Sequence, residues 1–372
     1  MNKRIALNAI AVDQFKSGAN SRFLGIFPAL ASLLFNSEFF IYKNSDCPVF
    51  ESFNTLENVE YINIPLRKSD RIKRSMLCFS YWDSNLKKLK PHIFENFCMP
   101  AVKFREGLNL LTIHDIRRAY LPKFHPERIA YEFAINKSLR HTDQVIAVSQ
   151  SMAEELESRF QPKNITVIYN AVDVKRLSDL RTKLNCNPPR GFKPFSEFLL
   201  SVGHLEPRKN YGRLLVALNI LKCRGYDVPL IIVGHDNGLK QRLFEQAHAL
   251  KLCDNIRWYS DIPEHDLAYL YASCSALILP SIYEGFGIPL IEAMAMKVPV
   301  AMSNLPVFKE VFGAGGEYFD PYDPESIASA VLSILADNAH RERVVCRGSA
   351  RVWRFDIARS AADYAELYNA YL

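Results

Sequence analysis

The sequence predicts an α/β protein built from two parallel-sheet domains of the Rossmann-like type. Short apolar runs alternate with stretches of helical length along most of the chain, which is the pattern of repeated strand–helix–strand units. The runs are continuously apolar, as expected for strands covered by helices on both faces. The chain has 372 residues, which exceeds a typical domain and suits two domains of about 180 residues each.

The composition is that of an ordinary globular protein. Hydrophobic residues make up 49% of the chain and charged residues 23%, and no apolar run is long enough to cross a bilayer. The net charge of +6 permits an anionic ligand or membrane surface but requires neither, and we expect no nucleic-acid partner. The 8 cysteines are scattered without a Cys-x-x-Cys pair, which favours reduced thiols in a cytoplasmic protein.

The first predicted strand, Ile5–Val12, leads through a loop of small residues into an apolar helix that ends near Leu34. Asn8 and Asp13 interrupt the apolar stretch, which favours a strand over a signal peptide. A dinucleotide-binding turn would carry Gly-x-Gly-x-x-Gly at this place. The loop has Gly18 alone, so an NAD site is disfavoured, and Gly18 fits an ordinary turn equally well.

The predicted strand Leu108–Ile113 delivers His114 to its carboxyl end. Ligands of open α/β sheets gather at the carboxyl ends of the strands, so His114 is a candidate site residue, although a lone histidine is more often structural. Two further strands, Gln144–Ser149 and Ile165–Asn170, are joined by a helix predicted over 151–160.

A stretch rich in turn-forming residues, Asn185–Gly191, separates the two halves of the chain. We therefore predict a first domain over residues 1–185, a second over 196–355 and an amphipathic C-terminal helix over 356–372, whose apolar stripe must be buried. The strands predicted for the second domain are Phe198–Val202, Leu230–Val233, Ile256–Tyr259, Ala276–Leu279 and Val298–Met302, with helices between them such as Leu214–Leu221 and Gln241–Leu250.

The segment after Leu279 has the pattern of an anion-binding turn. It contains Gly285 and Gly287, and Pro289 marks the first turn of the next predicted helix. Free N–H groups and the positive end of the helix dipole would then point into a crevice, where phosphate binds well.

Two carboxylates bracket this turn. Glu284 precedes the glycines, and Glu292 lies inside the predicted helix. Eight helical residues span about 12 Å, which is the scale of a nucleotide sugar with its sugar at one glutamate and its ribose at the other. The alternative is an ordinary surface glutamate together with a helix-capping glutamate.

Arg208 and Lys209 form a second candidate phosphate site, since they follow the end of a strand and precede a helix. Arginine binds phosphate oxygens in pairs, and lysine supplies a compact charge. Taken as an isolated dipeptide, the two residues would instead be a solvated surface pair.

Together these motifs resemble those of the retaining glycosyltransferases of family 4. The resemblance rests on Tyr-Glu-Gly-Phe-Gly-Ile-Pro at 283–289 with its Glu-x7-Glu spacing, on Gly-His-Leu-Glu-Pro-Arg-Lys-Asn at 203–210 and on Ile-His-Asp at 113–115. It covers nearly the whole chain but is loose before His114. The chain departs from the family at His204, where many members carry arginine.

The resemblance implies the GT-B fold, with two Rossmann-like domains facing across a cleft and the C-terminal helix crossing back to the first domain. It implies that Glu284 holds hydroxyls of a donor sugar, that Glu292 holds the ribose and that Lys209 meets the diphosphate. The catalytic residues carried over are His114, Lys209 and Glu284, and the donor-binding residues are Gly18, His204, Arg208, Phe286, Gly287, Ile288 and Glu292.

The activity implied is transfer of a hexose, with retention, from a nucleoside diphosphate sugar to a saccharide acceptor, expected to be lipid-linked, in surface-polysaccharide assembly. The Leu-Glu-Pro-Arg-Lys-Asn variant looks like bacterial mannosyltransferases, so GDP-mannose is the first choice of donor. No Asp-x-Asp occurs, which argues against the metal-chelating GT-A type, and we expect neither a metal nor another cofactor. The residues do not distinguish a front-side mechanism from double displacement.

Two other classes remain open. A nucleotide-sugar sensor would need Arg208, Lys209 and Glu292 but neither Glu284 nor His114, and an epimerase or phosphorylase could share the architecture. Both Glu284 and His114 are present, which favours a transferase over a sensor.

The segment Leu66–Lys90 mixes basic residues with Phe79, Tyr81 and Trp82. It could face an anionic membrane or a lipid-pyrophosphate acceptor, which would place the enzyme peripherally on the cytoplasmic face of a membrane. The alternative is a solvated helix surface beside core aromatic residues.

Overall fold

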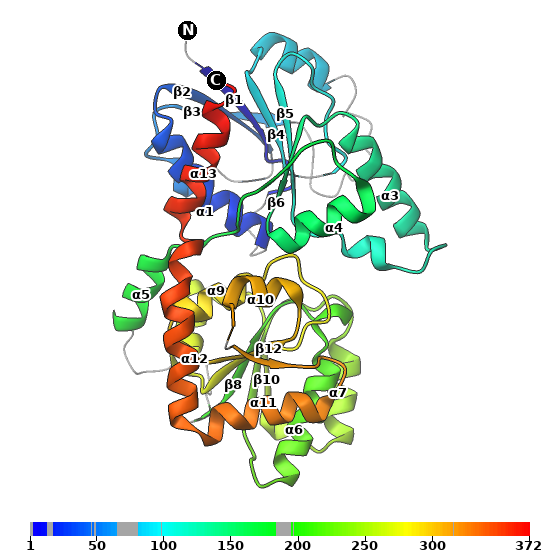
Figure 1. The fold of residues 1–372 in the computed structure, drawn as a ribbon, viewed down its shortest axis with the longest axis vertical. Coiled ribbons are helices and arrows are strands. Elements are labelled where there is room, and N and C mark those ends of the chain that lie inside the picture. Colours follow the sequence, from blue (N-terminus) through cyan, green and yellow to red (C-terminus); the bar gives the residue numbers. More distant parts are fainter. Residues whose placement is uncertain are drawn as a thin grey trace. The chain divides into compact units, whose positions relative to one another are not determined.

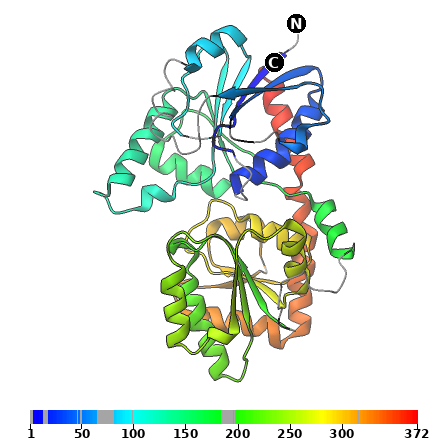
Figure 2. The ribbon, with the colours of Figure 1, turned by 180° about the vertical axis from the view of Figure 1, so that it is seen from behind.

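The chain forms two compact units, Met1–Val172 with Phe355–Leu372, and Asp173–Arg354. Each unit contains a parallel sheet with helices packed against it, as Figures 1 and 2 show from opposite sides. The predicted fold class, two parallel-sheet α/β domains, is therefore confirmed. The computed structural model describes residues 3–12, 18–45, 47, 50–64, 81–97, 99–183, 195, 197–314 and 316–372.

In the first unit the described strands form one parallel sheet in the order β3-β2-β1-β4-β5-β6-β7. The chain starts at β1 in the interior of the sheet, reaches one edge at β3 and then crosses to β4 on the other side of β1. Ligand sites of such sheets lie at this reversal, at the carboxyl ends of the strands. The strands are β1 (Lys3–Asn8), β2 (Ser37–Asn44), β3 (Val59–Ile64), β4 (Ile93–Asn96), β5 (Leu108–Ile113), β6 (Gln144–Ala147) and β7 (Ile165–Val167).

This sheet has a hydrophobic core on each face. Ile5 belongs to one core and its neighbour Ala6 to the other, because successive side chains of a strand point to opposite faces. The first core includes Tyr364 of the C-terminal helix α13 (Ile357–Asn369), which packs against α1 (Gly18–Leu33). The other helical segments named in this unit are η1 (Glu51–Phe53), η2 (Arg117–Tyr120), α3 (Pro126–Leu139) and α4 (Gln150–Phe160).

Trp82 lies in the second of these cores and is only 2% exposed. Its ring centre is 4.8 Å from that of Tyr42 and 5.3 Å from that of Phe94. The expectation that Trp82 faces a membrane is therefore wrong, because its ring packs against one face of the sheet. Apart from 81–90, the segment Leu66–Lys90 lies outside the described residues.

Within the described part of the chain, no helix has the length and apolar composition needed to cross a bilayer.

The second unit has a parallel sheet whose described strands follow the order β10-β9-β8-β11-β12-β13. Here β8 and β11 are hydrogen-bonded neighbours at the reversal of strand order, so the loops that follow them meet at the carboxyl edge. The strands are β8 (Leu199–Val202), β9 (Leu230–Val233), β10 (Ile256–Tyr259), β11 (Ala276–Leu279), β12 (Val300–Ser303) and β13 (Glu317–Phe319).

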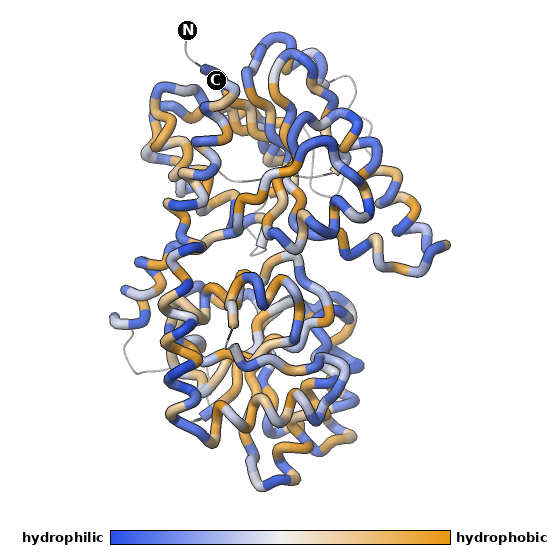
Figure 3. Tube along the Cα trace, viewed as in Figure 1, coloured by the Kyte–Doolittle hydropathy of each residue, from blue (hydrophilic) through white to orange (hydrophobic). Residues whose placement is uncertain are grey.

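Helices α6, α7 and α11 share one hydrophobic core with this sheet, while α9 packs against α5 and α12. Figure 3 shows hydrophobic residues along the strands and hydrophilic ones on outer turns of the helices. The helical segments are α5 (Val174–Lys183), η3 (Pro207–Lys209), α6 (Tyr211–Cys223), α7 (Lys240–Ala249), η4 (Cys253–Asn255), α8 (Glu264–Ser273), α9 (Ile288–Ala295), α10 (Pro306–Phe312), α11 (Pro324–Ala336) and α12 (Asn338–Arg351); η5 (Val352–Phe355) leads into α13.

The boundary between the units differs from the predicted one. The sequence predicts it after residue 185, but α5 packs against α8 and α9 and so belongs to the second unit. The first unit ends at Val172, whose N–H donates to the Phe355 carbonyl at 3.0 Å. The start of the C-terminal segment is thereby paired with the end of the first unit's main segment.

Candidate donor-binding site

Two loops of the second unit are tied together at the carboxyl edge of its sheet. The Asn210 side chain, in the loop after β8, donates hydrogen bonds to the carbonyl oxygens of Pro280 at 2.9 Å and Pro321 at 2.7 Å. The Ile282 N–H, in the loop after β11, donates to the Arg208 carbonyl at 2.8 Å. These bonds bring the basic residues of one loop next to the acidic residue of the other.

Glu284 is the centre of a largely buried charge cluster. Its Oε1 lies 2.6 Å from Lys209 Nζ and accepts a hydrogen bond from Ser281 Oγ at 2.7 Å. Its Oε2 lies 2.6 Å from an Arg208 nitrogen, and Arg208 also pairs with Glu206 at 2.6 Å. The side chains of Lys209 and Glu284 are 9% and 10% exposed. These charge-assisted bonds are therefore shielded from water and salt.

The cluster keeps Glu284 ionised. Burial by itself opposes ionisation, but Lys209, Arg208 and the hydrogen bond from Ser281 outweigh it and lower the pKa of Glu284 to about 2. The carboxylate is therefore a hydrogen-bond acceptor at neutral pH and is unsuited to act as a general acid. The two glutamates of the cluster balance its two cations, so the cluster is neutral as a whole.

Two glycines make room for this arrangement. Gly203 has a φ of +152°, and a Cβ there would lie 2.8 Å from Lys209 Nζ. Gly287 has a φ of +107°, and a Cβ there would lie 2.7 Å from Phe308 Cε1. The positive φ therefore favours glycine at both positions, and at Gly287 the buried ring of Phe308 also leaves no room for a Cβ.

Helix α9 begins at Ile288, directly after Gly287, with Pro289 in its first turn. Its first N–H groups and positive dipole end follow Glu284 closely in the chain, which is the predicted arrangement for an anion site. Phe286 is 3% exposed, so its ring packs in the interior.

Glu292, in the second turn of α9, is held by a tyrosine from α8. Tyr271 donates a hydrogen bond from its hydroxyl to Glu292 Oε2 at 2.7 Å. Burial, followed by the charge of Glu292, raises the pKa of Tyr271 well above its ordinary value, so the hydroxyl keeps its proton. Sequence reasoning missed Tyr271, because it looks like any core aromatic residue of an amphipathic helix.

His204 follows Gly203 in the turn after β8. Its ring centre lies 5.5 Å from that of His235. Burial lowers the pKa of His204 in spite of the opposing effect of Glu206, which favours a neutral imidazole. A neutral ring can still hydrogen-bond a phosphate, although it does not replace the charge of arginine.

Gly18 and His114 lie in the first unit, whereas the other predicted site residues lie in the second. Gly18 is exposed and is the first residue of α1, and His114 directly follows β5. Burial and then the charge of Arg22 lower the pKa of His114 to about 3, so its ring is neutral at pH 7. Among the described residues, neither of its nitrogens has a hydrogen-bond partner.

A buried polar network surrounds Arg22, which sequence reasoning also missed. Arg22 is 0% exposed and donates to Asn170 Oδ1 and to the Tyr364 hydroxyl, both at 2.9 Å. The Tyr364 hydroxyl in turn donates to Glu95 at 3.1 Å, and Thr112 donates to the same carboxyl at 2.6 Å. The network joins α1, two strands and α13, and its sequence signal is limited to one charged residue in an otherwise apolar helix.

Two known families match the sequence, one in each half of the chain. Residues 18–176 match the family Glycosyltransferase Family 4, and residues 188–351 match the family Glycosyl transferases group 1. The O-antigen chain mannosyltransferase B of Escherichia coli is 30% identical over 277 residues, which cover 73% of this chain and 72% of that protein. The serotype-specific mannosyltransferase WbdA of Escherichia coli is 34% identical over 246 residues, which cover 62% of this chain but 30% of WbdA.

The fold has close relatives among solved structures. The structure of Anabaena Alr3699/HepE in complex with UDP and glucose matches with a TM-score of 0.69 and 19% identity, covering 100% of both chains. At this low identity the likeness shows only that the fold is shared. The two family matches and the mannosyltransferase relative are matches of sequence, and together they include residues of both units. The chain therefore belongs to the family 4 glycosyltransferases.

Proposed function

We propose that this glycosyltransferase transfers mannose from GDP-mannose to a saccharide acceptor, with retention at the anomeric carbon and without a metal ion. The observation that carries the proposal is the cluster in which Lys209, Arg208 and Ser281 bond Glu284 beside the start of α9. Mannose is supported by relatives that are named mannosyltransferases. GDP is the nucleotide expected from the Leu-Glu-Pro-Arg-Lys-Asn motif.

The negative charge that develops on the leaving diphosphate needs fixed positive groups around it. Lys209 has three N–H donors and Arg208 has five, and the carboxylates of the cluster use some of them. The free N–H groups at the N-terminus of α9 contribute the equivalent of about half a positive charge. Because these groups are already oriented in a shielded site, they stabilise the transition state without reorganising.

Glu284 would bind hydroxyls of the donor sugar. An ionised carboxylate only accepts hydrogen bonds, and sugar hydroxyls donate them. Since Glu284 is bonded to Lys209, this contact links the sugar to the diphosphate end of the site. Glu292 would hold the ribose hydroxyls in the same way.

We further propose a front-side reaction, in which the leaving phosphate takes the proton of the acceptor hydroxyl. Glu284 is the carboxylate nearest the proposed sugar position, but three donors already bond its oxygens. A carboxylate with a pKa near 2 is a weak nucleophile, because its negative charge is already stabilised. This favours its use as a binding group over covalent catalysis.

For the acceptor we propose a lipid-linked saccharide at the cytoplasmic face of a membrane. The support is the basic composition of the segment 66–80, which lies outside the described residues. Each cation near an anionic surface could contribute about 1 kcal/mol, reduced by salt. The buried ring of Trp82 takes no part in this contact.

A panel of nucleotide sugars tests the proposed function. A ligand at 100 times its dissociation constant stabilises the folded state by about 2.7 kcal/mol, so GDP-mannose should raise the melting temperature more than UDP-glucose or UDP-galactose. Proton NMR of the product should show an α-mannoside, which is the configuration of the donor. The rate of transfer should be the same with and without EDTA. A β-product, a rate that depends on Mg²⁺ or stabilisation by UDP-sugars alone would contradict the proposal. Turnover that needs inorganic phosphate in place of a saccharide would instead identify a phosphorylase.

A further inference from the structure

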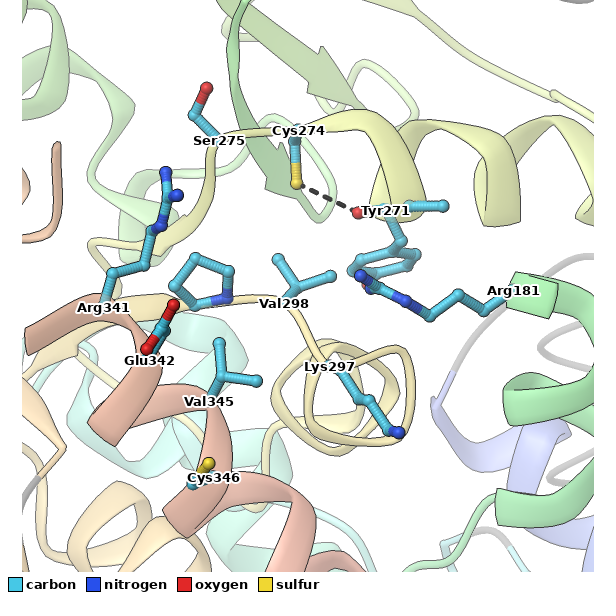
Figure 4. A pocket seen from close by; sticks show the side chains of 12 residues that line it. Arg181, Tyr271, Cys274, Ser275, Lys297, Val298, Arg341, Glu342, Val345 and Cys346 are labelled. Carbon is cyan, nitrogen blue, oxygen red and sulfur yellow. Dashed lines mark hydrogen bonds between the residues drawn. The ribbon is translucent and has the colours of Figure 1, made fainter. Parts of the chain in front are cut away.

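A cavity of about 430 Å³ lies in the second unit, and Figure 4 shows the side chains that line it. It lies at the amino ends of two strands, at the edge of the sheet opposite the candidate donor site. Its lining includes Cys274 and Ser275, which precede β11, and Val298 and Pro299, which precede β12. The Glu284 cluster instead follows the carboxyl ends of β8 and β11. The volume falls in the range of about 300–1,000 Å³ that is typical of small-molecule sites.

Three cations line this cavity: Arg181, Lys297 and Arg341. In the structure as described, none of them has a carboxylate oxygen within 4.0 Å, whereas both Arg208 and Lys209 are paired with carboxylates. Glu342 is the acidic residue of the lining. The cavity therefore collects positive charge that the protein does not neutralise by ion pairing.

The helix C-termini at this edge are partly negative and so disfavour an anion, but they do not cancel the excess positive charge of the cavity. Helices α8 and α9 end here, and each C-terminus carries about half a negative charge. Arg181 donates to the carbonyl of Met296, the C-cap of α9, and so offsets that end. Lys297 and Arg341 still outweigh Glu342 and the end of α8.

The remaining lining is largely apolar. Val298, Pro299 and Val345 contribute aliphatic surface, and Tyr271 contributes its ring. Figure 4 shows Val298 and Val345 in the part of the cavity between the side chains of Arg341 and Arg181. A ligand that fits this lining combines an anionic group with a small apolar group.

We propose that this cavity is a second ligand site, which binds a small organic phosphate. The phosphate would meet Arg341, since a guanidinium binds two phosphate oxygens at once, while Lys297 and Arg181 add positive charge to the same cavity. The apolar part would pack on Val298 and Val345. None of the residues predicted to bind the donor lines the cavity, although Tyr271, which bonds Glu292, contributes to its lining.

Cys346 provides a local reporter of occupancy. It is exposed and lines the cavity, whereas Cys223 is exposed and lies on α6 outside the cavity lining. We would follow alkylation of both thiols by iodoacetamide with mass spectrometry while adding phenyl phosphate. At ten times its dissociation constant, the ligand should slow alkylation of Cys346 about tenfold and leave Cys223 unchanged. No protection, or equal protection of both thiols, would overturn the proposal.

Matched variants identify the groups responsible. The double change Lys297→Gln with Arg341→Gln should abolish the protection. The control, Lys251→Gln with Arg343→Gln, removes the same charge and should keep it. Lys251 has a positive φ of 55° like the 52° of Lys297, and Arg343 lies on the same helix as Arg341. Equal protection of Cys346 in both double variants would show that Lys297 and Arg341 do not bind the phosphate.

Three further probes separate the parts of the proposed ligand. Phenol alone should not protect Cys346, and inorganic phosphate should protect it more weakly than phenyl phosphate does. Protection by phenol, or equal protection by phosphate and phenyl phosphate, would contradict an organic phosphate site. Vesicles containing phosphatidic acid should give no protection, and protection by them would assign the site to a lipid headgroup.

Discussion

Tyr271 donates a hydrogen bond from its buried hydroxyl to Glu292 Oε2 over 2.7 Å. The bond joins α8 to α9 and limits the orientation of the carboxylate that we propose binds the ribose. The hydroxyl does this without placing a positive charge beside Glu292, so the carboxylate keeps its strength as an acceptor for ribose hydroxyls.

The first prediction is that Tyr271→Phe weakens binding of GDP by up to about tenfold, because Glu292 would no longer be held in place before the ligand binds and would have to be ordered on binding. Turnover at saturating donor should change less. Tyr269→Phe is the matched control, since Tyr269 lies on the same helix and its hydroxyl makes no hydrogen bond in the described structure. Calorimetric titration with GDP measures both variants, and equal affinities would show that the bond does not position Glu292.

Glu284 and Glu292 should separate by role. Glu292→Gln is expected to weaken binding of free GDP as well as of GDP-mannose, because ribose is common to both. Glu284→Gln should leave the affinity for GDP nearly unchanged and lower transfer, because its proposed partner is the sugar. Equal loss of GDP affinity in both variants would rule out the assignment of the two glutamates to opposite ends of the donor.

Lys209→Ala should lower kcat/KM by an amount equivalent to about 2–3 kcal/mol, since a charged donor to the diphosphate is lost. The variant should remain folded, as circular dichroism can verify. Lys222→Ala, on the outer part of α6, is the control for removal of one lysine from this unit. Kinetics of Lys209→Ala close to those of the wild type would remove the diphosphate role.

Acid should destabilise the wild type through Glu284. Its folded-state pKa of about 2 lies below its ordinary value of 4.5, so its contribution is present above pH 4.5 and is lost as the pH falls toward 2. Between pH 6 and pH 3 this loss amounts to about 2 kcal/mol. Glu284→Gln cannot titrate, so its unfolding free energy in urea should fall by about 2 kcal/mol less over the same interval. Parallel pH profiles would contradict the low pKa.

The basic segment should govern membrane contact. Replacing Arg67, Lys68, Arg71, Lys73 and Arg74 by serine should reduce sedimentation with anionic vesicles at low salt and leave donor hydrolysis unchanged. The parent protein at high salt serves as the comparison, because screening should have the same effect. Undiminished vesicle binding by the variant would show that the segment is an ordinary solvated surface and does not bind the membrane.

Much of the second sheet can be predicted from the sequence by itself. The predicted strands Leu230–Val233, Ile256–Tyr259 and Ala276–Leu279 coincide with β9, β10 and β11. These strands contain runs of apolar residues bounded by turn formers, so their pattern is local. The sequence also offers Lys209 and Glu284 as site candidates, because each lies in a loop after a predicted strand and within a motif that resembles those of the family.

The tertiary structure alone decided which groups meet. The bond between Lys209 and Glu284 joins residues 75 positions apart, and the contact between Glu95 and Tyr364 joins residues 269 positions apart. Strand β4 escaped prediction because Glu95 and Asn96 interrupt its apolar pattern, and their burial is tolerated only through partners remote in the chain. Apolar periodicity reports which residues leave water, whereas the partners of buried charges depend on how distant segments pack.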